Sequence, residues 1–155
     1  MDREQLEVDV LFVGAGPASL GAALHLSRLL RDHNSAVESG QKSGPTLDPL
    51  LLVVEKGREI GSHALSGAVV DPRAFDELFE GWDTPPPPWD SPVLHEEIHY
   101  LTKSRSFQLP FTPPPLNNHG CFIASLGKIV QWMAALCEEN GVEAVSYTHL
   151  TLPTN

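Results

Sequence analysis

Three small residues near the start of the chain follow a short apolar run in the order Gly14-x-Gly16-x-x-Ser19. Gly14 permits a tight turn out of a strand, and Gly16 has no side chain, so a pyrophosphate can approach the backbone there. Pro17, Ala18 and Ser19 begin a helix whose free N–H groups and positive dipole end suit that anion. The motif predicts a dinucleotide site, with Ser19 in place of the usual third glycine.

An acidic residue, Glu55, ends the next apolar run, with Lys56 beside it. A carboxylate at this place accepts hydrogen bonds from two ribose hydroxyls and repels a 2′-phosphate, which argues against NADP. The acid usually follows the first glycine by about 20 residues, and here a longer loop separates them. The glycines alone leave FAD and NAD open, as well as a glycine-rich turn of another α/β protein.

The elements that must position these residues are two apolar runs and a helix between them. Val8–Val13 and Leu50–Val54 suit strands covered on both faces of a parallel sheet. The segment His33–Pro49 is rich in Ser, Gly, Asn and Pro, and we expect an exposed loop there. An apolar stripe predicts the helix: Leu20, Ala23, Leu24, Leu26 and Leu30. Strand, glycine turn, helix and strand form the first βαβ unit of a Rossmann-like α/β fold.

Further elements follow along the chain. Asp71–Trp82 is expected to be a helix that Asp71 caps, with Pro72 at its first position. The remaining predictions are a hairpin of Ile98–Thr102 with Phe107–Leu109, a strand at Cys121–Ala124 and a helix from Ser125 to Asn140 ended by Gly141.

The composition of the chain limits the kinds of partner that it is expected to bind. The 155 residues carry a formal net charge of -10, which argues against a nucleic-acid partner because phosphate binding needs clustered Lys and Arg. Cys121 and Cys137 are the only cysteines and form no CxxC pair, so we expect two reduced thiols. No apolar run approaches the roughly 20 residues of a membrane-spanning helix.

Two histidine-containing blocks, Ile60–Ala68 and Leu116–Gly120, are more specific than the glycine turn. Three flanking blocks accompany them at matching spacing: Val53–Gly57, Asp71–Pro72 and Ser125–Gly127. On these blocks the chain, over about residues 8–143, resembles the N-terminal region of electron-transfer-flavoprotein:ubiquinone oxidoreductases.

The resemblance implies a glutathione-reductase-type FAD-binding domain, here incomplete. Proteins of this family take electrons from reduced electron-transfer flavoprotein and pass them to ubiquinone, using FAD and one 4Fe-4S cluster. The cluster belongs only to the longer parent chain, since its cysteine ligands are absent here, and we predict no metal ligands in this chain. The fragment is therefore expected to be inactive alone.

The resemblance also implies which residues contact FAD. The loop Gly61–Gly67 is expected to approach the flavin end of the cofactor. For His63 and His119 we favour structural polar contacts over proton transfer. The expected cofactor-binding residues are Gly14, Gly16, Pro17, Ala18, Ser19, Glu55, Lys56, Gly61, Ser62, His63, Leu65, Ser66 and Gly67.

A membrane surface is a further expected contact. One face of the predicted helix 71–82 carries Phe75, Leu78, Phe79 and Trp82, which could either pack in the core or enter a membrane surface. With the family resemblance we favour the membrane. Since no targeting segment is evident, we expect peripheral attachment to the cytoplasmic face of a bacterial inner membrane, with the mitochondrial inner membrane as the alternative.

Two alternatives to the oxidoreductase remain. One is a geranylgeranyl-reductase-like flavoprotein, and the other is a nucleotide-binding fragment without catalysis. For domain organisation, we expect a partial FAD-binding domain over residues 1–145 and a non-native tail over residues 146–155.

Overall fold

The computed structural model describes residues 6–146, which form two compact units. The first unit combines the chain up to Leu65 with the chain from Leu126 onward, and the second is Ser66–Ser125. The partial FAD-binding domain predicted for residues 1–145 stays a prediction. So does the non-native tail at 146–155, of which all but Ser146 lies outside the described residues.

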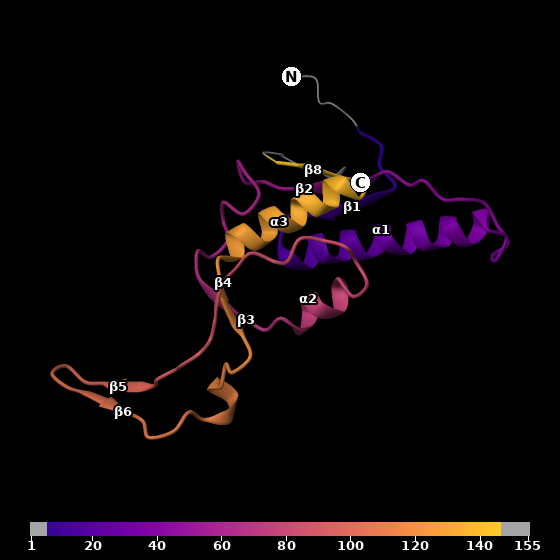
Figure 1. Cartoon of the computed structure of the whole chain (residues 1–155). Helices are drawn as coiled ribbons and strands as arrows, with labels where there is room; N and C mark the ends of the chain where they lie inside the picture. The colour runs from indigo at the N-terminus through magenta and orange to yellow at the C-terminus, as the bar shows by residue number, and fades with distance from the viewer. Residues whose placement is uncertain (1–5, 147–155) are drawn as a thin grey trace, which may run out of the picture. The chain divides into compact units, whose positions relative to one another are not determined.

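A parallel sheet of three strands forms one layer of the first unit (Figure 1). Its order is β1 (Val10–Val13), β2 (Leu51–Val54) and β8 (Val142–Val145). All four residues of β2 are buried, as expected for an apolar strand between two neighbours. The two strands predicted around the glycine turn are confirmed, and β8 is an additional strand. The expected cover on both faces is wrong for β1, in which Leu11 and Val13 are exposed because both helices lie on the other face.

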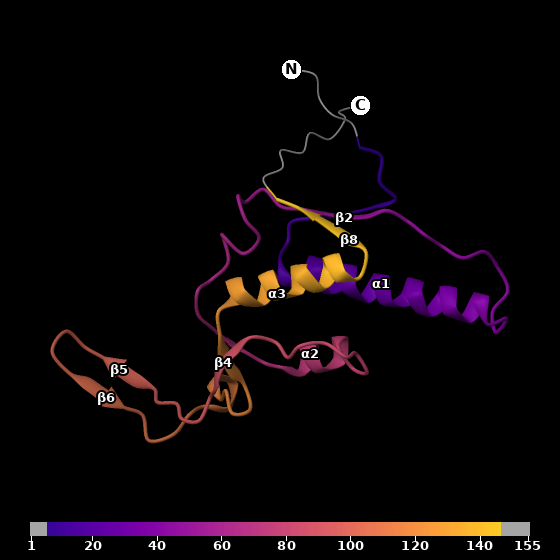
Figure 2. The same cartoon turned by 45° about the horizontal axis from the view of Figure 1, so that its top comes forward.

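Two helices cover the same face of this sheet (Figure 2). They are α1 (Pro17–Glu38) and α3 (Leu126–Glu139), which pack against each other. Residues at helical spacing form the shared core: Leu20, Ala23, Leu24, Ile129, Val130, Met133, Leu136 and Cys137. The predicted helix at 125–140 is confirmed, and it ends before Gly141, which has a φ of 78°.

The predicted start of the exposed loop, His33, is too early, because α1 continues through residues 33–38 and the loop begins only after it. Its polar composition misled the prediction: Pro17 and Gly40 bound a stretch with only one glycine, Gly21, so nothing in it stops the helix. The helix ends where Gly40 adopts a φ of 73°. Asn34, near that end, binds the returning loop: its Nδ2 donates to the Leu47 carbonyl and its Oδ1 accepts the Leu47 N–H.

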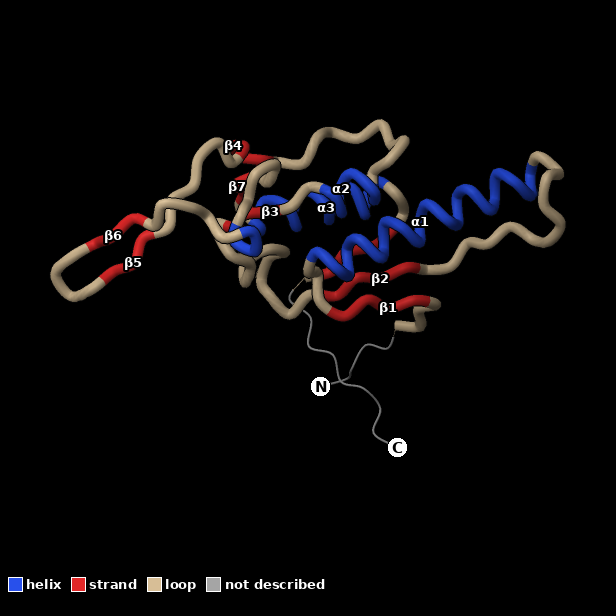
Figure 3. Tube along the Cα trace, turned by 90° about the horizontal axis from the view of Figure 1, so that it is seen from below, coloured by secondary structure: helices blue, strands red, loops and turns tan. Residues whose placement is uncertain are grey.

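The second unit contains two small antiparallel sheets (Figure 3). One has the order β3 (Ala68–Val70), β7 (Phe122–Ala124), β4 (Trp89–Pro92), and the other pairs β5 (His99–Leu101) with β6 (Ser106–Gln108). The predicted hairpin and the predicted strand at 121–124 are confirmed. A 3₁₀ turn, η1, covers Pro114–Leu116.

The helix predicted at Asp71–Trp82 is shorter in the structure, where α2 covers Arg73–Leu78 with Pro72 as its N-cap. Asp71 still accepts the Arg73 N–H, but its carboxylate also binds the Arg73 guanidinium. Aromatic packing explains the apolar face: Phe75 meets Trp89 edge-on at 5.2 Å between ring centroids. The four residues predicted to touch a membrane are half-buried in the structure.

Candidate functional site

The glycine turn between β1 and α1 is fixed to the neighbouring strand. Gly14 has a φ of +92°, a conformation that favours glycine, and its N–H donates to the Val54 carbonyl at 2.7 Å. A Cβ added to Gly14 or Gly16 would meet no atom within 4 Å. The two glycines therefore border open space, and a ligand can approach their backbone.

The start of α1 is suited to an anion. Gly16 is the N-cap and offers no side-chain cap, Pro17 follows it, and the first turn holds no acidic residue. The N–H groups of Ala18 and Ser19 have no acceptor within the helix, because intrahelical bonding starts with Leu20, whose N–H donates to the Gly16 carbonyl. Free N–H groups and the helix dipole give this corner a positive potential.

The carboxylate of Glu55 lies beside this turn. Its Oε2 accepts the Ala15 N–H at 2.9 Å, and its Oε1 accepts the Gly57 N–H at 2.7 Å. The hydrogen bonds from Ala15 and Gly57 outweigh the cost of burial and hold the pKa of Glu55 below its usual value, with smaller electrostatic contributions from His63 and Lys56. Glu55 is therefore ionised at neutral pH, and it can accept further hydrogen bonds because each carboxylate oxygen has two lone pairs.

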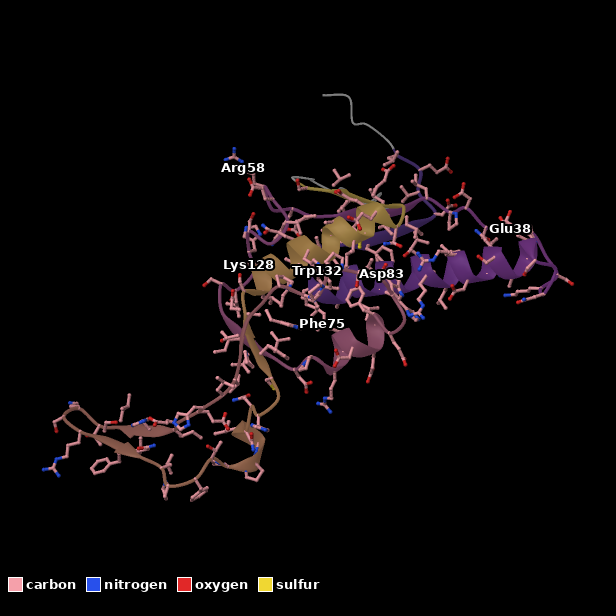
Figure 4. All side chains as sticks on the ribbon, viewed as in Figure 1. Glu38, Arg58, Phe75, Asp83, Lys128 and Trp132 are labelled. Atoms are coloured by element: carbon pink, nitrogen blue, oxygen red, sulfur yellow. The ribbon has the colours of Figure 1, made fainter. Side chains whose placement is uncertain are left out.

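The backbone of Glu55 is also held, since its N–H donates to the Val145 carbonyl at the end of β8 at 2.8 Å. Lys56 follows as an exposed residue, and Arg58 projects from the same loop, as Figure 4 shows. The structure thus brings the predicted acid and the predicted glycine turn together at the carboxyl end of a parallel sheet, where nucleotides bind in such folds.

The loop after Glu55 packs on the start of α3. Gly61 has a φ of +86°, and a Cβ there would lie 2.8 Å from the Gly127 carbonyl oxygen, so close packing requires the glycine. Ser62 donates its hydroxyl to the Glu59 carbonyl at 2.6 Å. The Leu65 side chain is exposed and its carbonyl accepts the Gly127 N–H. The predicted contacts of these residues with a cofactor remain predictions.

His63 lies near Glu55, with its Nδ1 3.9 Å from Glu55 Oε1. Buried Gly57 lies between the two side chains, and its lack of a side chain lets them approach each other, a role that the sequence analysis did not predict. The signal available was a glycine two residues after the acid. Ser66 and Gly67 belong to the second unit.

The second histidine block is held within the second unit. Asn118 donates its N–H and its Nδ2 to the carboxylate of Glu96, at 3.1 and 3.0 Å. The His119 N–H donates to Asn117 Oδ1 at 2.8 Å, a local structural contact.

The cysteines are free thiols, with Cys137 buried and Cys121 half-buried. Burial raises the pKa of Cys137 to about 12. Over residues 6–146, no three His, Cys, Asp or Glu side chains gather into a candidate metal site. Within the same residues, none of the helices combines the length and apolar character needed to cross a membrane.

A polar hollow of about 360 Å³ lies elsewhere in the first unit. Its lining comes from the second half of α1, the returning loop and the end of α3, and includes Arg31, Asn34 and Asn140. None of the predicted site residues lines it, so the glycine turn remains the candidate site.

Parallel strands, a glycine turn at a helix start and an ionised acid after the second strand together define a Rossmann-like α/β fold of the flavoprotein type. A solved structure supports this fold: a geranylgeranyl bacteriochlorophyll reductase-like protein from Thermoplasma acidophilum has a TM-score of 0.53 and 20% identity, over 90% of this chain and 30% of that chain. This likeness shows the fold alone.

Sequence relatives carry the identification further. The chain is 40% identical over 144 residues to the mitochondrial electron transfer flavoprotein-ubiquinone oxidoreductase of Sus scrofa, covering 92% of the chain and 21% of the relative. It is 42% identical over 146 residues to the electron transfer flavoprotein-ubiquinone oxidoreductase of Pseudomonas aeruginosa, covering 92% and 24%. The resemblance stated from the histidine blocks is confirmed. No protein-family model matches the chain. The chain spans less than a quarter of the length of these two relatives.

Proposed function

We propose that this chain binds the ADP half of FAD at the glycine turn, as part of a longer oxidoreductase. The observation that carries the proposal is the bond between Glu55 and the Ala15 N–H, which holds the acid beside the turn. The carboxylate of Glu55 accepts hydrogen bonds from the ribose hydroxyls, while the N–H groups of Ala18 and Ser19 donate hydrogen bonds to the pyrophosphate oxygens. Gly14 and Gly16 leave space for that approach.

FAD is proposed over NAD because of the similarity to electron transfer flavoprotein-ubiquinone oxidoreductases, not because of the glycines. When bound, FAD supplies the redox chemistry, and the protein orients it and tunes its surroundings. The chain's own residues hold the adenosine end: the fixed acid orients the ribose, and the start of α1 neutralises the charge of the pyrophosphate.

For the longer protein we propose electron transfer from reduced electron-transfer flavoprotein to ubiquinone. The names of the relatives support this assignment. A 4Fe-4S cluster, if present, would be bound by residues outside this chain. The proposal includes peripheral membrane attachment on the cytoplasmic face of a bacterial inner membrane, with the mitochondrial inner membrane as the alternative.

Membrane contact within the second unit is better supported at the β5–β6 hairpin than at α2. Tyr100 and Phe107 are directly paired across the hairpin and are 68% and 52% exposed. The turn between the strands carries exposed Lys103 and Arg105, whose charges suit anionic headgroups. We therefore propose this hairpin as a membrane contact, and the contact expected at Phe75, Leu78, Phe79 and Trp82 stays a prediction.

The test uses the longer protein that contains this chain. Purified with its flavin, it should reduce a ubiquinone analogue when given reduced electron-transfer flavoprotein, and Glu55→Gln should lower the flavin content. A protein that holds flavin but does not oxidise electron-transfer flavoprotein would favour a relative such as a geranylgeranyl-reductase-like enzyme. A protein that holds no flavin would refute the proposal.

A further inference from the structure

The loop from Gly57 to Leu65 is fixed by its own bonds and by α3. The Ser62 hydroxyl accepts the Glu59 N–H at 3.2 Å and donates back to the Glu59 carbonyl at 2.6 Å. Gln131, on α3, donates its Nε2 to the Ile60 carbonyl at 3.1 Å. All these residues belong to the first unit, so the loop holds its side chains in place beside the end of β2.

His63 is the side chain that this loop brings to the acid. A Cβ added to Gly57 would lie 3.1 Å from Glu55 Oε1 and 3.2 Å from His63 Nδ1, so the glycine lets the two groups converge. The His63 side chain is 66% exposed while that of Glu55 is 16% exposed. The imidazole is therefore open to a ligand that reaches the carboxylate.

The separation of the two groups suits a shared ligand. At 3.9 Å, His63 Nδ1 and Glu55 Oε1 are too far apart for a direct hydrogen bond. A hydroxyl oxygen can lie about 2.8 Å from both atoms at once. Ionised Glu55 is only an acceptor, so this hydroxyl would donate to Glu55 and accept from the N–H at Nδ1 of His63.

We propose that His63 binds a ribose hydroxyl together with Glu55, and so lies at the adenosine end of the dinucleotide and not at the flavin end. The inference rests on the proposed function, because it requires a dinucleotide at the glycine turn. It gives the exposed imidazole a role in selecting a ribose diol, and it differs from the expectation that the loop Gly61–Gly67 approaches the flavin, which stays a prediction.

The test compares ADP with 2′-deoxy-ADP and 3′-deoxy-ADP as ligands of this chain, by isothermal titration calorimetry. His63→Ala should weaken ADP binding about threefold to tenfold, the value of one hydrogen bond. It should leave unchanged the binding of the deoxy analogue that lacks the shared hydroxyl. His63→Asn places an amide N–H near the position of Nδ1 and should recover most of the affinity for ADP.

His25→Ala, which removes an exposed histidine of α1, is the matched control and should change nothing. An equal loss for ADP and for both deoxy analogues in His63→Ala, or no loss for any, would overturn the inference while leaving the dinucleotide site intact. A folded wild-type chain, checked by circular dichroism, that binds neither ADP nor FAD would instead refute the proposed function, and the inference with it.

Discussion

The carboxylate of Glu55 accepts the backbone N–H of Ala15, forty residues earlier in the chain, at 2.9 Å. This bond joins the acid after β2 to the turn after β1. The group proposed to bind ribose is thereby held against the turn proposed to bind pyrophosphate. Since the same carboxylate also accepts the Gly57 N–H, removing it should change both the stability and the ligand binding of the first unit.

Glu55→Gln should lower the free energy of unfolding at pH 7 by about 1–2 kcal/mol. The amide keeps one acceptor oxygen but turns an NH₂ group toward a backbone N–H that had been bonded to oxygen. Urea denaturation followed by circular dichroism measures the change. Glu143→Gln, the same change at an exposed site on β8, should alter stability little.

The stabilisation from Glu55 should depend on pH. Its folded-state pKa is lowered from the ordinary value of 4.5, so the folded state binds the proton less readily than the unfolded chain does. The contribution is complete above about pH 5 and is lost as the pH falls through the lowered pKa. The difference between the wild type and Glu55→Gln should shrink as the pH falls from about 5 through the lowered pKa of Glu55, and a constant difference would contradict this account.

Gly61→Ala should destabilise the chain more than Gly40→Ala does. Both glycines have positive φ, at +86° and +73°, so each alanine incurs a strain of about 1–2 kcal/mol. Only at Gly61 would the new methyl meet backbone, the Gly127 carbonyl oxygen at 2.8 Å, which adds about 1–3 kcal/mol. Urea denaturation of both variants tests this prediction. Equal destabilisation would show that the loop shifts to accommodate the methyl group at residue 61 with no further loss of stability.

The strands and helix around the glycine turn could be predicted because their signals are local. Val10–Val13 is an apolar run that ends at a glycine, and Pro17 is well suited to the first position of a helix. The predicted end of α1 was wrong because a polar composition does not by itself end a helix. Asn34 and Ser35 are polar but helical, and the chain turns only at Gly40.

The contacts within the site could be predicted only in part. An acid after a strand indicates ribose binding, and this placed Glu55 near the turn. The sequence does not show that Ala15 donates to it or that His63 lies 3.9 Å away, because those contacts depend on how the loop packs on α3. Gly61 signalled an unusual backbone position, but its neighbour Gly127 lies 66 residues later and only tertiary packing brings them together.

The two cysteines should differ in reactivity. Burial removes Cys137 from solvent and raises its pKa to about 12, so almost no thiolate forms at pH 8. Cys121 is half-buried and should react first with iodoacetamide, whereas Cys137 should react only after unfolding. Mass spectrometry of labelled peptides measures both sites, and equal labelling of the folded chain would contradict the burial of Cys137.

The β5–β6 hairpin should contribute to vesicle binding. Replacing Tyr100 and Phe107 together with aspartate should weaken binding to phosphatidylcholine–phosphatidylglycerol vesicles by at least about tenfold, since each buried aromatic side chain contributes roughly 1.5–3 kcal/mol. Leu47→Asp, at an exposed site on the loop after α1, is the matched control. If cosedimentation finds both variants bound as tightly as the wild type, the hairpin is not the membrane contact.

The central claim is tested most directly by titrating FAD into the chain and following the quenching of flavin fluorescence, with wild type, Glu55→Gln and Glu143→Gln compared at pH 7. We predict saturable binding that Glu55→Gln weakens by at least about tenfold, because hydrogen bonds from ribose hydroxyls to a carboxylate are lost, while Glu143→Gln has no effect. Saturable binding with the same affinity in all three proteins, or none by the folded wild type, would contradict the assignment of the glycine turn and Glu55 as the FAD site.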